Sequence, residues 1–134
     1  MGAPVSACAA ISRACPRLDP QGWAFCTGGS LQADALGTFR EAEGRSQILP
    51  LDTARATGHD VSLPMARIVL EVHSALDGTG LTAAVSGGLA EAGIPCNMAA
   101  AYHHDHAFVP LGDAERALAI LRRLQADAPE HDGP

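Results

Sequence analysis

The second half of the chain alternates between strand-like and helix-like hydrophobic periods. Residues 67–73 alternate around branched apolar side chains, which is typical of a strand buried on at least one face. From Leu81 to Gly93 the apolar residues recur every three or four positions, which predicts an amphipathic helix. The pattern then predicts strands over 96–102 and 106–111, joined as a hairpin through 103–105, and a second amphipathic helix over 113–126.

The first half shows a weaker version of the same pattern. The motif Asp19-Pro20-Gln21-Gly22 predicts a turn, because Pro at the second and Gly at the fourth position are typical of β-turns. The linker over 59–65 is short, so we expect the two halves to pack as one body. The elements predicted here are a helix over 5–14, strands over 23–27, 36–41 and 45–49, and a helix over 51–57. We therefore divide the chain into a first half (1–60), a second half (65–126) and a polar tail (127–134).

The second half resembles the ACT domain family of small ligand-sensing modules. His73 and Ser74 close its first predicted strand, Cys96-Asn97 opens the next, and the segment 102–110 completes the similarity. The sequence of these segments is similar to that of a subgroup of free-standing bacterial ACT proteins of largely unassigned function. Residues 25–27 and 38–44 extend this similarity into the first half. The resemblance implies an α+β, ferredoxin-like ACT fold, with two tandem ACT-like halves, of which the first is degenerate, and helices packed on antiparallel sheet.

Composition narrows the class of partner. The chain has 134 residues and a formal charge of −6, and all nine basic residues are Arg. An acidic chain without a basic run disfavours nucleic-acid binding, because phosphate contacts dominate such affinity. No stretch approaches the length of a membrane span, and we expect a cytoplasmic protein. Four cysteines without C-x-x-C spacing are expected to be reduced, small apolar residues: Cys8, Cys15, Cys26 and Cys96.

The histidines and cysteines do not predict catalysis. No serine elbow, paired carboxylates or H-E-x-x-H motif is present, so we predict no enzyme and no cofactor. The ferredoxin-like topology would bring His73 near His104 and His106, and three imidazoles could bind a divalent metal ion. The alternative, which we favour, is that they are polar residues of a hairpin and a partner-facing surface, with no metal.

A glycine-rich segment in front of the helix at Leu81 is the candidate ligand site. A helix N-terminus offers free N–H groups and a positive dipole end, which suit a carboxylate, although a plain tight turn is equally compatible. The resemblance extends to the serine-sensing ACT domains of phosphoglycerate dehydrogenases, which bind an amino acid between two subunits through a His ending the first strand and an Asn opening the second. Ala75 stands where those domains have an amide, so serine itself is not implied. The ligand-binding residues predicted in this way are His73, Ser74, Asp77, Gly78, Thr79, Gly80, Leu81 and Asn97.

These observations predict a non-catalytic, regulatory homodimer that binds an amino acid or a similar small carboxylate. The alternative is a structural or interaction module, which pairs with another chain through its sheet edges and binds no small molecule.

Overall fold

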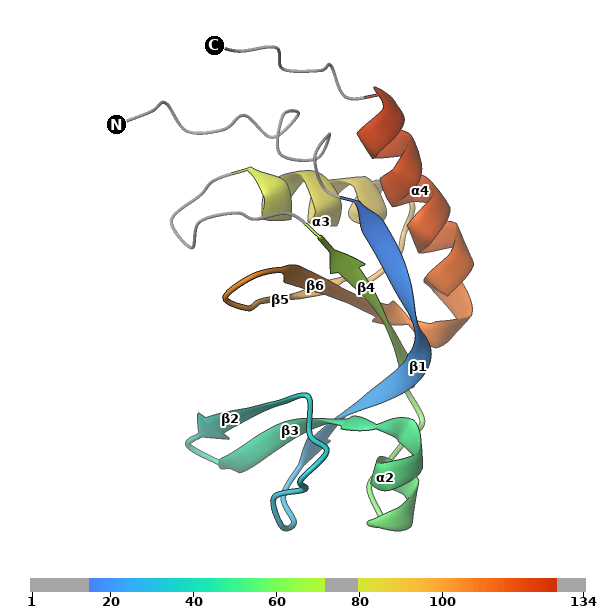
Figure 1. Ribbon diagram of the computed structural model, residues 1–134. Coiled ribbons are helices and arrows are strands. Elements are labelled where there is room, and N and C mark those ends of the chain that lie inside the picture. Colours follow the sequence, from blue (N-terminus) through green and yellow to red (C-terminus); the bar gives the residue numbers. More distant parts are fainter. Residues whose placement is uncertain (1–14, 72–79, 128–134) are drawn as a thin grey trace, which may run out of the picture.

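The computed structural model describes residues 15–71 and 80–127, which form one curled antiparallel sheet with helices on its outer face (Figure 1). The six strands lie in the order β2-β3-β1-β4-β6-β5 in a single sheet, so the expected α+β fold with helices packed on antiparallel sheet is confirmed. The elements are β1 (Pro16–Thr27), β2 (Gly37–Glu41), β3 (Gly44–Pro50), α2 (Leu51–Ala56), β4 (Met65–Leu70), α3 (Leu81–Glu91), β5 (Asn97–Ala100), β6 (Asp105–Pro110), a 3-10 turn (Leu111–Asp113) and α4 (Ala114–Asp127).

Strand β1 differs from its prediction. The motif at 19–22 does not turn the chain back but is an irregularity inside one twelve-residue strand, where the register against β4 shifts between Leu18 and Gly22. The side chain of Asp19 accepts the backbone N–H of Gln21 at 2.9 Å, which is the local bond that such a motif favours. Pairing on both sides of the irregularity keeps the strand extended, and β1 therefore belongs to both halves.

The other predicted elements lie where the pattern put them, to within a few residues. Leu70 of β4 is paired with Asp105 of β6, so the end of the first ACT strand meets the start of the third as expected. Gly88 of α3 packs closely on α4, since an added Cβ there would lie 2.5 Å from Cδ1 of Leu124. The helix predicted over 5–14 lies outside the described residues, as do residues 128–134 of the tail.

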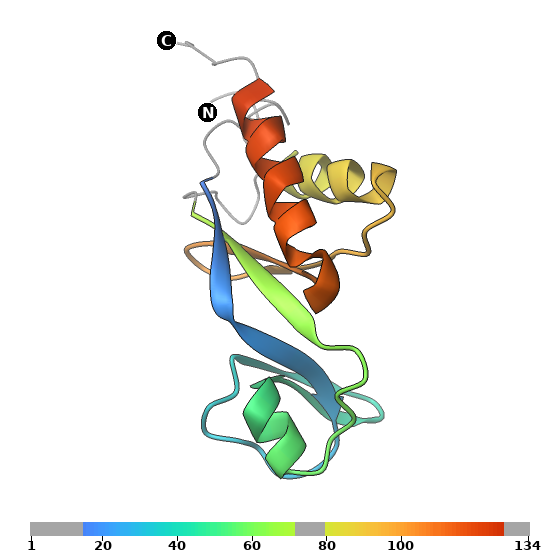
Figure 2. The ribbon, with the colours of Figure 1, turned by 90° about the vertical axis from the view of Figure 1, so that its right-hand side faces the viewer.

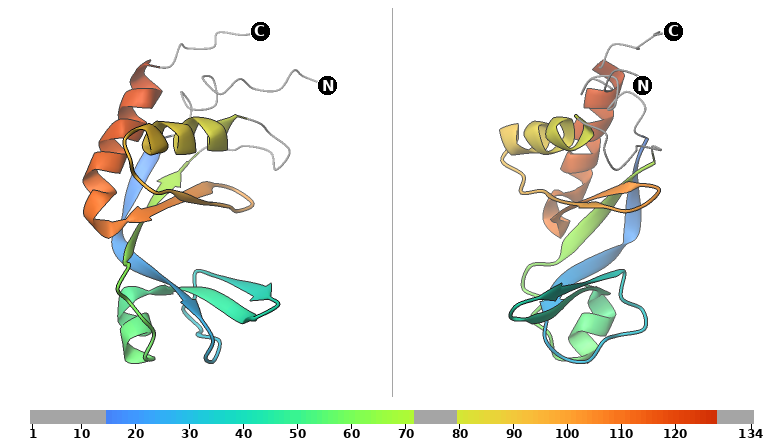
Figure 3. Two further views of the ribbon diagram at one scale, coloured as in Figure 1. Left: turned by 180° about the vertical axis from the view of Figure 1, so that it is seen from behind. Right: turned by 90° about the vertical axis from the view of Figure 1, so that its left-hand side faces the viewer.

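The outer face of the sheet carries two apolar clusters. The larger cluster joins β4 and β6 to α3 and α4, and includes Ile68, Val85 and Leu121. A smaller cluster joins β1 and β3 to α2 through Ala24, Leu49 and Ala54. Figures 2 and 3 show α3 and α4 at one end of the sheet and α2 at the other, with β1 running between them.

The inner face of the sheet is aromatic. Trp23, Met65 and Phe108 form a buried cluster there, and none of the described helices contributes to it. The ring of Phe25 meets that of Phe108 edge to face, with centroids 5.1 Å apart. Phe39 lies on the same face, because it is paired with Ser46 of β3, and Ser46 is paired with Thr27 of β1. All three phenylalanines and the only tryptophan of the chain thus lie on the inner face.

Candidate functional site

Only part of the predicted ligand site falls within the described residues. His73, Ser74, Asp77, Gly78 and Thr79 lie outside them, so their predicted roles stay predictions.

The two described residues before and at the start of α3 are placed as a helix N-terminus requires. Gly80 precedes the helix with a φ of 102°, a conformation that glycine adopts at little cost, and Leu81 is buried. Gly80 has no side chain to cap the helix, and the first turn of α3 carries no acidic residue. Its N–H groups and the helix dipole therefore have no compensating side chain from these positions.

Asn97 lies at a different place. It opens β5 opposite Phe108, after the C-terminal end of α3, and lines a groove with residues of the first half. Neither Gly80 nor Leu81 lines this groove. Within one chain, the structure therefore does not bring Asn97 together with the helix start.

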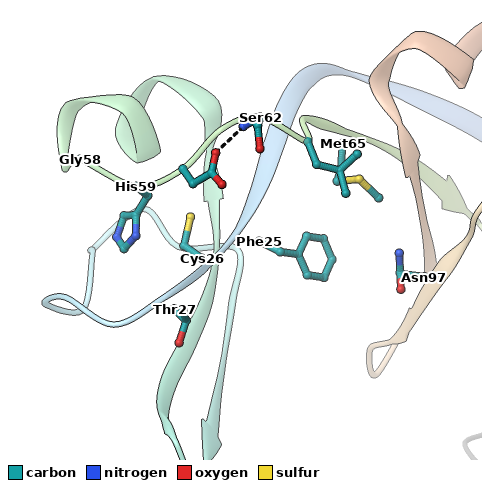
Figure 4. A pocket seen from close by; sticks show the side chains of 10 residues that line it. Phe25, Cys26, Thr27, Gly58, His59, Ser62, Met65 and Asn97 are labelled. Atoms are coloured by element: carbon teal, nitrogen blue, oxygen red, sulfur yellow. Dashed lines mark hydrogen bonds between the residues drawn. The ribbon is translucent and has the colours of Figure 1, made fainter.

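The groove runs along the edge of β1, and we call it the edge groove. Its volume is about 610 Å³, within the range of small-molecule sites. Figure 4 shows Phe25 projecting from β1 toward Asn97, with Met65 beside them. The lining residues are Phe25, Cys26, Thr27, Gly58, His59, Asp60, Ser62, Leu63, Met65 and Asn97.

A second, more apolar groove lies beside the first, between the β2–β3 and β5–β6 hairpins. Its volume is about 730 Å³, and Phe25, Phe39 and Ile48 line it together with Ala99. Phe25 and Thr27 belong to both grooves, so the two form one continuous depression on the inner face.

A polar cluster occupies the inner face next to the aromatic residues. Nε and the terminal Nη2 of Arg67 both lie 2.9 Å from Oδ2 of Asp19, and the Trp23 indole N–H donates to the same oxygen at 2.9 Å. The guanidinium of Arg67 also stacks over Trp23, 5.3 Å from its ring centre. Burial by itself would raise the pKa of Asp19, but the hydrogen bonds from Gln21, Trp23 and Arg67 outweigh it and lower that pKa.

His106 completes this cluster. Its Nδ1 lies 3.5 Å from Nη1 of Arg67, and since Arg can only donate, Nδ1 acts as the acceptor. Burial, followed by the charges of Arg67 and His104, lowers the pKa of His106, while Asp105 opposes them. The surroundings of His106 therefore favour its neutral form over the charged one.

The three-histidine metal arrangement is only partly described. His106 lies in β6, but His104 precedes that strand and closes the hairpin turn, where its carbonyl accepts the N–H of Ala101 at 3.0 Å. Among residues 15–71 and 80–127, no group of three or more His, Cys, Asp or Glu side chains could hold a metal ion. The described cysteines, Cys15, Cys26 and Cys96, are free thiols.

Sequence reasoning missed the contribution of the first half to a site. The sequence places Phe25 in a short strand and in the segment 25–27 that extends the resemblance, and Leu63 in a linker, but assigns neither residue to a site. The alternation of Trp23, Phe25 and Thr27 in a chain with only five aromatic residues is the signal that indicates an aromatic sheet face.

Known structures share this architecture. A protein from Vibrio cholerae, described as of unknown function and possibly a transport protein, is 36% identical, with a TM-score of 0.76 over 86% of this chain and 92% of that one. A protein from Agobacterium tumefaciens is 21% identical, with a TM-score of 0.59 over 78% and 81% of the two chains. The ligand-free regulatory subunit of aspartate kinase from Thermus thermophilus is 12% identical, with a TM-score of 0.55 over 81% and 96%. The last two likenesses concern the fold alone.

Two further comparisons concern the sequence and its membrane character. A search of curated proteins finds no match to this chain. Within the described ranges, the helices are too short or too polar to cross a bilayer.

The ACT domain family matches residues 66–123, which span β4 to α4 and include both Gly80 and Asn97. This match indicates a regulatory module of ligand-binding type and no catalytic family, and residues 66–123 therefore form an ACT domain.

Proposed function

We propose that this chain is a non-catalytic regulatory module of the cytoplasm that binds an amino acid and works as a homodimer. The observation that carries the proposal is the family match over 66–123, because it includes the helix start at Gly80 and the strand start at Asn97. An amino acid needs N–H donors for its carboxylate and acceptors for its ammonium group, and these two places offer both.

A dimer would allow the two places to meet. Since they lie apart within one chain, the helix start of one subunit would face Asn97 of its partner, and residues His73 to Thr79 would extend the site. Among the described strands, β5 forms one edge of the sheet and has a neighbour on one side only, so it can accept a second chain.

A thermal-shift screen against the amino acids tests the proposal. A ligand at 100 times its dissociation constant adds about 2.7 kcal/mol to the free energy of unfolding. Asn97→Ala should weaken binding by about 1 to 3 kcal/mol, because a charged partner is left unpaired. Gln21→Ala is the matched control, since it removes an exposed amide elsewhere on the sheet. Equal shifts in wild type and Asn97→Ala would contradict the role of Asn97.

The second candidate is an interaction module without a small ligand. The observation that favours it is that β2 and β5 are the two edge strands of the sheet formed by residues 15–71 and 80–127. Sedimentation of the protein over a range of micromolar concentrations, alone and with amino acids, separates the two. A stable dimer without a thermal shift from any amino acid would favour this candidate, and a monomer at every concentration would exclude the interfacial site.

A further inference from the structure

Strand β1 has one complete edge and one incomplete edge. On one side it pairs with β3 from Trp23 to Thr27, but on the other the ladder with β4 ends at Trp23 and Met65. Continued pairing would place Leu63 opposite Phe25. Instead, the linker bends away, since Pro64 follows and the backbone N–H of Ser62 donates to Oδ1 of Asp60 at 2.8 Å. The edge groove therefore occupies the position of a missing strand.

The backbone of Phe25 points into this opening. The Ile48 carbonyl accepts the N–H of Leu36 at 2.8 Å, on the side of β3 that faces β2. In an antiparallel strand the N–H and C=O of one residue point to the same side, and those of the next residue point to the other side. The backbone of Ile48 therefore bonds toward β2 and not toward Phe25, its neighbour on β1. The N–H and C=O of Phe25 thus face the groove, and no backbone hydrogen bond from another described loop reaches them.

We infer that the edge groove binds one free α-amino acid with a large apolar or aromatic side chain, paired with Phe25 as a strand of a single residue. Its ammonium group donates to the Phe25 carbonyl, and its carboxylate accepts the Phe25 N–H, which is the pair of bonds that two facing residues exchange in an antiparallel ladder. The inference rests on the proposed function for the class of ligand but differs in the location of the binding site. The site still includes Asn97, and β1 takes the place of the helix start at Gly80.

The preference for a large side chain follows from strand geometry. Residues that face each other across a ladder carry their side chains on the same face of the sheet, so the ligand's side chain lies on the inner face beside the Phe25 ring. Phe25 is 49% exposed, its ring contacts that of Phe108 edge to face, and it points toward Asn97 across the groove (Figure 4). An aromatic side chain placed there covers apolar surface on Phe25 and gains an offset or edge-to-face contact, which serine cannot provide.

Titration calorimetry of the full chain with L-phenylalanine and L-serine tests the inference. Phenylalanine should bind at least about tenfold more tightly than serine, because burial of one aromatic side chain contributes at least that much to the affinity. Phe25→Ala should weaken phenylalanine binding by about tenfold or more. Tyr102→Ala is the matched control: Tyr102 is an 81% exposed aromatic residue outside both grooves, and its loss should leave the affinity unchanged. Both positions are exposed, and equal melting temperatures of the free variants verify that they fold.

Ligand analogues test the main-chain bonds. 2-Phenylethylamine lacks the carboxylate and 3-phenylpropionate lacks the ammonium group, so each should bind about 10 to 100 times more weakly than phenylalanine, the cost of one charge-assisted hydrogen bond. N-acetyl-phenylalaninamide keeps the backbone without either charge. Binding of this compound as tight as that of phenylalanine would overturn the free amino acid as occupant in favour of an extended peptide.

The outcomes separate this inference from the proposed function. If an amino acid binds and Asn97→Ala weakens it, but Phe25→Ala does not, the proposed function stands and the location at β1 is wrong. If serine binds as tightly as phenylalanine, the preference for a large side chain is wrong. If no amino acid binds, both fall together.

Discussion

At the scale of single residues, Asp19 connects parts of the chain that are far apart in sequence. Its two oxygens accept hydrogen bonds from Gln21, Trp23 and Arg67, and its side chain is only 11% exposed. A carboxylate held in this way fixes the irregular segment of β1 against β4. Asp19, which the sequence predicts to be a turn residue, thus makes tertiary contacts that connect β1 to β4.

We expect Asp19→Ala to lower the free energy of unfolding by about 2 to 3 kcal/mol, because it leaves the mostly buried guanidinium of Arg67 without its partner. Asp52→Ala removes a carboxylate from an exposed pair with Arg55 and should change stability by less than about 1 kcal/mol. Urea unfolding at pH 7 measures both. Similar losses for the two variants would show that Asp19 contributes no more than a surface charge.

His106 makes the stability depend on pH. Its pKa is lower in the folded chain than the ordinary value of about 6.5, so the unfolded state takes up the proton first as the pH falls. The contribution of the neutral imidazole is therefore complete above that value and is lost between it and the lowered pKa of the folded state. The lowered pKa of Asp19 acts in the same direction at more acidic pH.

Urea midpoints at pH 7, 6 and 5 check this expectation. His106→Gln keeps an acceptor for Arg67 but does not titrate, so the loss of stability between pH 7 and pH 5 should be smaller in the variant than in the wild type. An identical loss in both would assign the dependence to other groups.

At the scale of elements, α3 carries two adjacent glycines in different surroundings. An added Cβ at Gly87 meets nothing within 4 Å, whereas at Gly88 it would displace Leu124 from the contact between α3 and α4. Gly88 therefore serves close packing, and Gly87 does not.

The two alanine substitutions should have different signs. Gly87→Ala should raise the free energy of unfolding by about 0.5 to 1 kcal/mol, since alanine is the better helix former. Gly88→Ala gains the same helix propensity but moves Leu124, a flexible and partly exposed side chain, so we expect no net gain or a small loss. Thermal unfolding of the two variants under one condition gives the comparison, and an equal gain in both would exclude the steric role of Leu124.

Elements with a strong hydrophobic period were predictable, and the others were not. The stripe from Leu81 and the extended runs that became β4, β5 and β6 are local properties, which a sequence displays directly. The length of β1 is not local, because pairing with β4 on one side and β3 on the other overrides the turn chemistry at Pro20. The open edge beside Phe25 was hidden for a related reason: it depends on where β4 stops.

At the scale of the whole molecule, the two halves meet at one aromatic junction. Trp23 comes from β1, Met65 from the start of β4 and Phe108 from β6, and Phe25 reaches Phe108 from the half that carries α2. Because β1 is a single strand of both halves, neither half can lose its core without exposing an edge of the other. The edge groove exists at this junction, and its shape depends on both halves staying together.

We therefore expect the two halves to unfold in one cooperative transition. Trp23 fluorescence reports on the junction, and far-ultraviolet circular dichroism reports mostly on α3 and α4, so their urea midpoints should coincide in the wild type. Phe108→Ala removes a fully buried ring from the junction and should cost about 3 to 5 kcal/mol. Phe39→Ala, at the exposed end of the same face, should cost less than about 1 kcal/mol and serves as the control. Two separate midpoints in the wild type would mean that the halves fold independently, and in that case the junction could not fix the geometry of the groove.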